Sequence, residues 1–170
     1  TTRICGIEAA RFAILAGNFL DSESAMALGL LTHLVNPGDV NKTIASITKS
    51  GKPAIKYLGR PADLSHPTVT FALDFYSDNN MQSINSGKCP EGFSTDDKMV
   101  IKQLKSLSRA APIAISMSSA LLEDAINTGD DLEKGLSLEL ERLEEIFATN
   151  DSLEGLSALI EGRRPTYNNN

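Results

Sequence analysis

The fold of this chain is decided by residues 132–170, which read LEKGLSLELERLEEIFATNDSLEGLSALIEGRRPTYNNN. Apolar residues recur there at spacings of three and four, which places one stripe along a helix, at Leu132, Leu136, Leu140, Leu143 and Phe147. A second stripe follows, and we expect it to form the buried face of another helix: Leu153, Leu156, Leu159 and Ile160. The segment therefore predicts two consecutive amphipathic helices.

The corner between these helices carries start and stop signals. Asn150 tolerates a left-handed backbone and so predicts the end of the first helix. Asp151 predicts the N-cap of the second helix, because Glu154 stands three residues later, at the spacing of a capping box. Gly155 leaves room for another backbone to approach closely, and Gly162 predicts the end of the second helix. Two packed surface helices would account for this pattern without any further function.

The remaining sequence also predicts a mainly helical chain. In the first half we expect a helix over 7–16, a helix capped by Asp21 that ends before Gly29, a turn over 36–39, a weaker helix over 40–48 and a loop over 49–67. Residues 69–76 fit a strand or a short helix equally, because their periodicity is ambiguous. In the second half we expect a short helix that Asp78 caps and that carries Met81 and Ile84, followed by a loop over 86–92. Asp96 or Asp97 should open the next helix, which carries Val100, Leu104 and Leu107. A further helix should begin at Pro112 and carry Ile113, Met117, Leu121 and Ile126.

The amino-acid composition favours a globular protein over a membrane-spanning or nucleic-acid-binding one. The chain has 170 residues, of which 41% are hydrophobic and 22% charged, and these proportions are typical of a globular domain. No apolar run approaches the length of a membrane span, and the net charge of −6 argues against a broad nucleic-acid-binding surface. Cys5 and Cys89 fit reduced thiols, while His33 and His66 lack neighbours at metal-ligand spacing. The chain begins at Thr1, which is compatible with a fragment, a processed chain or an incomplete one.

The terminal corner also resembles a known family. Enzymes of the crotonase (enoyl-CoA hydratase/isomerase) superfamily commonly end in D-x-x-E-G-x-x-A-F-x-x-K-R-x-P-x-F. In the family a helix with Glu and Phe precedes this pattern, and the corresponding residues here are Phe147, Asp151, Glu154, Gly155, Ala158, Leu159, Gly162, Arg163, Pro165 and Tyr167. Near the other end, GIEAARFAILAG (6–17) is similar to the family's G-x-x-x-A-x-x-x-x-L-T-G helix, and FLDSESAMALGL (19–30) is similar to its I-x-A-x-x-A-x-x-x-G-L segment. The motifs occur in family order, and the resemblance covers about residues 1–40 and 96–167.

The resemblance implies a fold and a division of the chain. The fold would be mainly α, the helical C-terminal part of a crotonase-like (ClpP/crotonase ββα spiral) fold with at most one or two short strands. The family's short strand would fall on residues 31–35. Four parts are expected: the end of the crotonase core over 1–42, a family-variable insert over 43–95, a helical trimerisation or lid region over 96–167, and a disordered tail over 168–170.

The middle of the chain resembles a different branch of the same superfamily. Residues 71–84 are similar to a segment of the 3-hydroxyisobutyryl-CoA hydrolases, and Ala111-Pro112-Ile113-Ala114 is similar to a second, shorter motif of that branch. The terminal corner favours the hydratase/isomerase branch instead. We give the corner more weight because its matching residues are denser.

The resemblance implies chemistry on an acyl-CoA thioester, in fatty-acid or amino-acid degradation, with coenzyme A as part of the substrate and no separate cofactor. In the family, two backbone N–H groups stabilise an enolate oxygen and carboxylates act as acid and base. These groups precede the helix that begins here near Gly6, so the resemblance implies that this chain contains no catalytic residue. The expected partners are an acyl-CoA substrate, an N-terminal crotonase half and further copies in a trimer or hexamer. The expected location is the cytoplasm or the mitochondrial matrix.

The family also places coenzyme A contacts in its C-terminal region. Arg163 and Arg164 are the expected phosphate ligands, since a guanidinium suits phosphate oxygens, and Tyr167 falls on the family's final aromatic residue. The family's Lys falls on Gly162 and its Phe falls on Leu159, so this chain departs from the pattern at both positions. Two alternatives stay open: the arginines complement the dipole of the preceding helix, or the chain is a non-catalytic helical interaction module.

Overall fold

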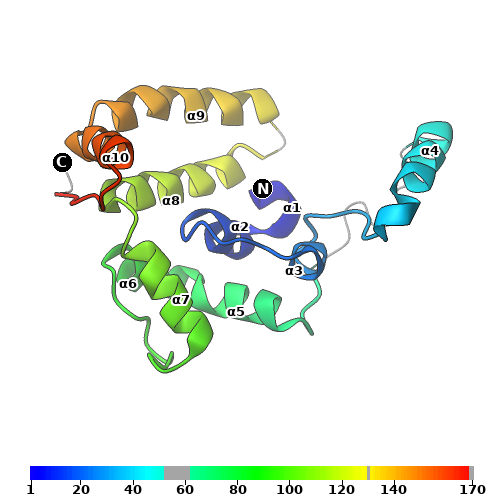
Figure 1. Ribbon diagram of the computed structural model, residues 1–170, viewed down its shortest axis with the longest axis horizontal. Helices are drawn as coiled ribbons and strands as arrows, with labels where there is room; N and C mark the ends of the chain where they lie inside the picture. The colour runs from blue at the N-terminus through cyan, green and yellow to red at the C-terminus, as the bar shows by residue number, and fades with distance from the viewer. Residues whose placement is uncertain (52–61, 130, 169–170) are drawn as a thin grey trace.

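The computed structural model describes a helical chain over residues 1–51, 62–129 and 131–168. These residues form ten α-helices and no strand (Figure 1). The helices are α1 (Thr2–Cys5), α2 (Ile7–Ile14), α3 (Ser22–Ala27), α4 (Val40–Ser50), α5 (Pro67–Phe75), α6 (Met81–Asn85), α7 (Lys98–Leu107), α8 (Pro112–Asn127), α9 (Leu132–Phe147) and α10 (Asn150–Glu161), with 3₁₀ turns η1 (Pro37–Asp39) and η3 (Asp78–Asn80). The prediction of a mainly α chain is confirmed. None of the described helices is long and apolar enough to cross a membrane.

Helix α2 lies at the centre of the arrangement. It packs against both α5 and α8, and the short α1 contacts α2 and α8 (Figure 1). Helix α9 lies alongside α8, and α10 meets α9 at one end. Helix α4 projects away from these helices and buries none of its residues. The core therefore forms around α2, and α4 lies outside it.

Small residues on α2 and aromatic residues on α5 make much of the core. Ala9 and Ala10 are buried, and their small side chains let neighbouring helices approach closely. An aromatic cluster with ring centroids between 5.0 and 6.2 Å apart completes this packing, and it contains Phe12, Phe71, Phe75, Tyr76 and Phe93. Most of these pairs meet edge to face, which is a geometry that the aromatic quadrupole favours.

A buried polar network lies beside the aromatic cluster. Tyr76 donates its hydroxyl hydrogen to Gln103 Oε1 at 2.9 Å, and Asn18 Nδ2 donates to the same oxygen at 2.7 Å. Gln103 Nε2 in turn donates to Asn18 Oδ1 at 3.2 Å. Burial raises the pKa of Tyr76 well above its usual range, so the phenol stays protonated and remains a donor. The network links the end of α5 to α7 and to the segment that follows α2.

A buried arginine on α2 joins four parts of the chain. Arg11 Nη1 donates to the Tyr76 carbonyl at 3.1 Å and to Asp78 Oδ1 at 2.7 Å, and Nη2 donates to Glu123 Oε1 at 3.2 Å. The Arg11 side chain is 2% exposed, whereas those of Asp78 and Glu123 are 82% and 55% exposed. The cation is therefore buried, while the carboxylates that pair with it remain largely in water. This one side chain connects α2, the end of α5, η3 and α8.

Several helix ends are where local sequence signals predict them. Asp21 caps α3 and Asp97 caps α7, and each carboxylate accepts a backbone N–H hydrogen bond at 2.7 Å. Pro112 occupies the first turn of α8. Gly29 follows the end of α3 with a φ of 80°, a left-handed conformation that glycine adopts without strain.

The predictions for residues 31–76 are met in part. The strand expected over 31–35 is wrong: this segment is irregular, and the described residues offer no strand that could pair with it. Residues 69–76, which fit strand or helix, belong mainly to α5, where Pro67 occupies the first turn and the His66 ring caps the helix. The expected helix over 40–48 is α4. Of the loop expected over 49–67, residues 52–61 lie outside the described residues.

One further local prediction, the cap at Asp78, is wrong. Asp78 lies in η3 and pairs with Arg11 instead of capping α6. The helix expected from Pro112 is confirmed as α8, but its buried positions are Ile115, Ser119 and Leu122, whereas the apolar residues named from the sequence are half-buried or exposed: Ile113, Met117, Leu121 and Ile126. Because α8 lies between α2 and α9, tertiary contacts decide which of its sides is covered.

The apolar stripes predicted on the last two helices exist, but they are not buried. The five stripe residues of α9 are between 47% and 66% exposed, and the four of α10 are between 50% and 86% exposed. In α10 the buried residues are Asp151 and Ala158. The predicted buried face of α10 is therefore wrong, because nothing among the described residues covers it. Contiguous apolar surface of this kind marks a contact site in folded proteins.

The Arg11 contacts give a first testable prediction. We expect Arg11→Ala to lower the free energy of unfolding by at least about 3 kcal/mol, because it leaves both a cavity and an unpaired Tyr76 carbonyl. Arg11→Met fills the space but cannot donate hydrogen bonds, and it should cost only about 1–3 kcal/mol. Urea unfolding of the full chain measures both. Arg142→Ala, on exposed α9, is the control and should change stability by less than about 0.5 kcal/mol. Equal costs for the two Arg11 variants would contradict this account.

Candidate functional site

The corner between α9 and α10 is capped one or two residues earlier than its sequence predicts. Thr149 caps α10, and its Oγ1 accepts a hydrogen bond from the Ser152 N–H at 3.1 Å. Asn150 is already the first residue of α10, so the predicted helix end at Asn150 and the predicted N-cap at Asp151 are both wrong. The reason is that the Thr149 hydroxyl takes the capping position. Both acidic side chains of the corner are thereby available to other partners.

These acidic side chains hold the C-terminal segment, here called the tail (163–168), against α10. Asp151 is 2% exposed, and its Oδ1 accepts a hydrogen bond from the Asn168 N–H at 2.8 Å. Glu154 Oε1 accepts one from the Thr166 N–H at 2.7 Å. Two backbone groups of a non-helical segment are thus fixed by two carboxylates three residues apart on one helix.

Arg163 forms the base of the tail and is paired with carboxylates. Its Nη1 and Nη2 donate to the two oxygens of Glu154 at 2.6 and 2.8 Å, and its Nε donates to Glu161. Gly162 makes this geometry possible, because its left-handed backbone, with a φ of 67°, ends α10 and turns the chain back. Hydrogen bonds from Arg163 and from the Thr166 N–H lower the pKa of Glu154 to about 2. The two carboxylates raise the pKa of Arg163 above its usual range.

Gly155 makes room for the ring of Tyr167. A Cβ atom at this position would lie 3.3 Å from the Tyr167 hydroxyl oxygen and 3.7 Å from Cε1. The close approach predicted at Gly155 is therefore made by a side chain of the tail and not by another backbone. The Tyr167 ring packs against α10 at Gly155, and a residue with a Cβ atom at this position would push the ring outward.

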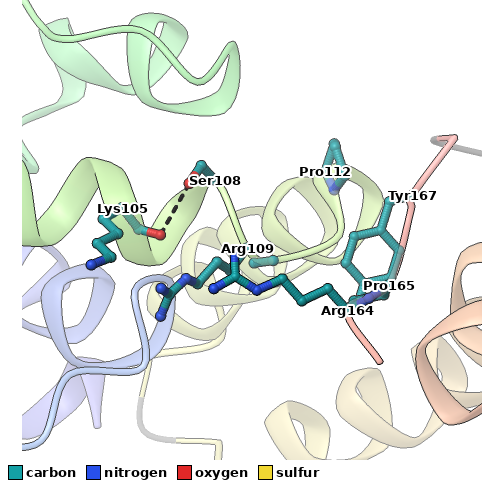
Figure 2. A pocket seen from close by; sticks show the side chains of 8 residues that line it. Lys105, Ser108, Arg109, Pro112, Arg164, Pro165 and Tyr167 are labelled. Atoms are coloured by element: carbon teal, nitrogen blue, oxygen red, sulfur yellow. Dashed lines mark hydrogen bonds between the residues drawn. The ribbon is translucent and has the colours of Figure 1, made fainter. Parts of the chain in front are cut away.

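A groove lies between the end of α7 and the tail, and we call it the basic groove (Figure 2). It has a volume of about 700 Å³ and is lined by Lys105, Ser108, Arg109, Ala110, Pro112, Arg164, Pro165 and Tyr167. Three lining residues are cationic and none is acidic. Lys105, Arg109 and Arg164 are exposed, and no ion pair within the described part of the chain neutralises them. This composition suits a ligand with several phosphate oxygens.

The structure separates the two arginines that the sequence predicts as phosphate ligands. Arg164 lines the basic groove together with Tyr167, whereas Arg163 is held by carboxylates of α10. Sequence reasoning missed Lys105 and Arg109. Lys105 lies in the last turn of α7 and Arg109 in the turn that follows the helix, and nothing in the sequence indicates that this end of α7 meets the tail.

An apolar hollow adjoins the basic groove. It has a volume of about 330 Å³, and its apolar lining includes Ile113, Ile146, Phe147 and Leu156. Tyr167 lines both the hollow and the groove. A ligand that carries both phosphate groups and an apolar or aromatic part therefore finds complementary surfaces next to each other.

Other side chains with reactive or ligand-binding atoms do not gather into a second site in the described residues. No group of three or more His, Cys, Asp or Glu side chains could hold a metal ion there. Cys5 and Cys89 are both free thiols. Burial raises the pKa of Cys5, which keeps that thiol protonated and unreactive.

Comparison with known proteins finds a partial similarity. The chain is 31% identical over 70 residues to a protein of Arabidopsis thaliana described as probable enoyl-CoA hydratase 2, mitochondrial. The match covers 41% of this chain but only 23% of that protein, so the chain spans less than a quarter of the relative's length. No family model and no solved structure matches the chain. The result is a distant, partial link to an enzyme family, and it agrees with the resemblance to the crotonase superfamily.

The lowered pKa of Glu154 gives a testable pH dependence. A carboxyl group whose pKa is lower in the folded chain stabilises it fully above the ordinary carboxyl pKa of 4.5. We expect the pairing of Glu154 with the tail to persist at mildly acidic pH and to be lost as the pH falls through about 2. An NMR titration of the Glu154 carboxyl carbon measures this. A midpoint at the ordinary value would show that the tail is not held by this residue.

Proposed function

We propose that this chain is the C-terminal portion of a crotonase-superfamily acyl-CoA enzyme, an enoyl-CoA hydratase or isomerase of fatty-acid or amino-acid degradation. The observation that carries the proposal is the basic groove, formed by α7 and by the tail that the family resemblance singles out. The distant similarity to an enoyl-CoA hydratase supports the same superfamily. The mitochondrial matrix or the cytoplasm would be its location.

In this proposal the basic groove binds the phosphate groups of coenzyme A. Arg164 and Arg109 supply planar guanidinium groups that can each donate two hydrogen bonds to one phosphate, and Lys105 supplies a compact charge. Tyr167 and the adjoining apolar hollow offer surface to the adenine ring or to the pantetheine arm. Arg163 acts indirectly, because its guanidinium already binds two carboxylates.

The proposal assigns no catalytic residue to this chain. The oxyanion hole and the acid–base carboxylates of the superfamily would come from an N-terminal crotonase half. The chain spans 23% of the matched hydratase, which leaves most of such an enzyme to other sequence. The role proposed for this portion is therefore to bind the substrate and to support assembly.

The exposed stripes of α9 and α10 would be contact surfaces between copies of the protein in a trimer or hexamer. Nine large apolar side chains lie on these two consecutive helices and are each at least 47% exposed. Burial of such surface gains about 25 cal/mol per Å², which is enough to drive association when whole helix faces are covered.

Two other functions have specific support. The similarity of residues 71–84 to the 3-hydroxyisobutyryl-CoA hydrolases favours a thioesterase, and turnover of crotonyl-CoA or of 3-hydroxyisobutyryl-CoA by the complete enzyme distinguishes the two. The exposed helix faces favour a non-catalytic interaction module. Such a module would have no reason to bind coenzyme A.

Binding of coenzyme A to the full chain tests the proposal. We expect saturable binding by isothermal titration calorimetry, weakened about three- to tenfold by Arg164→Ala, Arg109→Ala or Lys105→Ala, because each removes a charged contact at a solvent-exposed site. Added salt should weaken binding as well. Arg142→Ala, far from the groove on α9, is the control and should bind normally. Absence of binding, or equal binding by all variants, would contradict the proposal.

Association of the chain tests the proposed contact surfaces. We expect sedimentation velocity to show self-association that increases with protein concentration. Leu140→Glu combined with Phe147→Glu should abolish it without loss of helicity, since both side chains are exposed in the free chain. A wild-type chain that stays monomeric at every concentration would contradict the proposed role of α9.

A further inference from the structure

We propose that Asp151 and Glu154 are positioning residues for the basic groove. Neither lines the groove, although Asp151 lines the adjoining hollow, and the sequence suggests a different role for them, at the start of a helix. In the structure they hold Arg163, Thr166 and Asn168, which lie next to the three tail residues that line the groove, Arg164, Pro165 and Tyr167. The inference rests on the proposed function for the identity of the ligand, but it concerns anion binding by the groove in general.

The contacts alternate along the tail in a way that supports this role. Glu154 binds the side chain of Arg163 and the backbone N–H of Thr166, which directly precede Arg164 and Tyr167. Asp151 binds the N–H of Asn168, which directly follows Tyr167. Tyr167 thus lies between two anchored residues, and Arg164 directly follows one.

If these contacts were absent, a ligand that binds the groove would have to order the tail, and the loss of conformational entropy would weaken its binding. The Arg163 N–H donates to the Ala158 carbonyl at the end of α10, at 3.0 Å, but the N–H groups of Thr166 and Asn168 are bound by side chains. A ligand that had to order several free residues would lose affinity, because ordering a residue costs conformational entropy. The two carboxylates order the tail before a ligand arrives.

The direction in which anion affinity changes when Glu154 is removed distinguishes a positioning role from a purely electrostatic one. A carboxylate near an anion site repels the ligand, so electrostatics alone predicts tighter anion binding when Glu154 is removed. Positioning predicts weaker binding. Glu161 provides a matched control, because it is also a glutamate of α10 that binds Arg163 but makes no recorded contact with the tail backbone.

The experiment compares Glu154→Ala, Glu154→Gln and Glu161→Ala in the full chain, with coenzyme A and inorganic pyrophosphate as separate probes in isothermal titration calorimetry. We expect Glu154→Ala to weaken both probes at least about threefold and Glu161→Ala to leave them unchanged or slightly tighter. Glu154→Gln should recover part of the loss, since its amide oxygen still accepts from the Thr166 N–H.

Amide hydrogen exchange, read by NMR, follows the tail itself. We expect faster exchange at Thr166 in Glu154→Ala than in wild type, and no change in Glu161→Ala. Asp151→Asn keeps an acceptor for the Asn168 N–H and should leave exchange there slow, so it tests Asp151 without emptying a buried site.

The outcomes separate the two proposals. A wild-type chain that binds pyrophosphate but not coenzyme A would overturn the proposed function, while the variants still decide the positioning role. Equal or tighter binding by Glu154→Ala, unchanged exchange at Thr166, or a groove that binds neither probe would overturn the positioning role.

Discussion

The arrangement of this chain depends on one buried cation. Arg11 lies on the central helix, and its guanidinium reaches the last turn of α5, the η3 turn and α8. Burial of a charge is costly unless it is paired, and here the pairing carboxylates remain in water. They compensate the charge without being desolvated themselves. One of these contacts ties Arg11 to Glu123 of α8, and the start of α8 lines both the groove and the apolar hollow.

Helix ends that depend only on neighbouring residues could be predicted from the sequence. The caps at Asp21 and Asp97, the proline that begins α8 and the glycine that follows α3 depend on local backbone geometry, so no tertiary information is needed. The corner after α9 shows where this reasoning fails. Thr149 and Asp151 both fit a cap, and the choice depends on the tail that Asp151 binds. That tail returns from the far end of α10, beyond the reach of a local signal.

Periodicity identified which side chains share a helix face but not what covers that face. The stripes of α9 and α10 have correct helical spacing and remain exposed, because the described residues contain nothing that packs on them. Only the part of the groove lining that comes from the tail could be predicted from the sequence. Arg164 and Tyr167 belong to a dense terminal motif, whereas Lys105 lies on an ordinary helix with other lysines and Arg109 lies in the turn that follows it. Their role follows from the packing of α7 and α8 near the tail.

Local charge and total charge act in opposite directions in this protein. The net charge of −6 repels an approaching polyanion at long range and slows its encounter with the groove. At short range the three unpaired cations dominate, because the groove lining contains no acidic side chain and because Glu154 and Glu161 share the positive charge of Arg163. Adjacent arginines therefore have different partners: Arg163 offsets part of the negative charge of α10, whereas Arg164 lines the groove without an ion-pair partner among the described residues. An acidic chain can bind an anion in this way only where its own carboxylates are already paired.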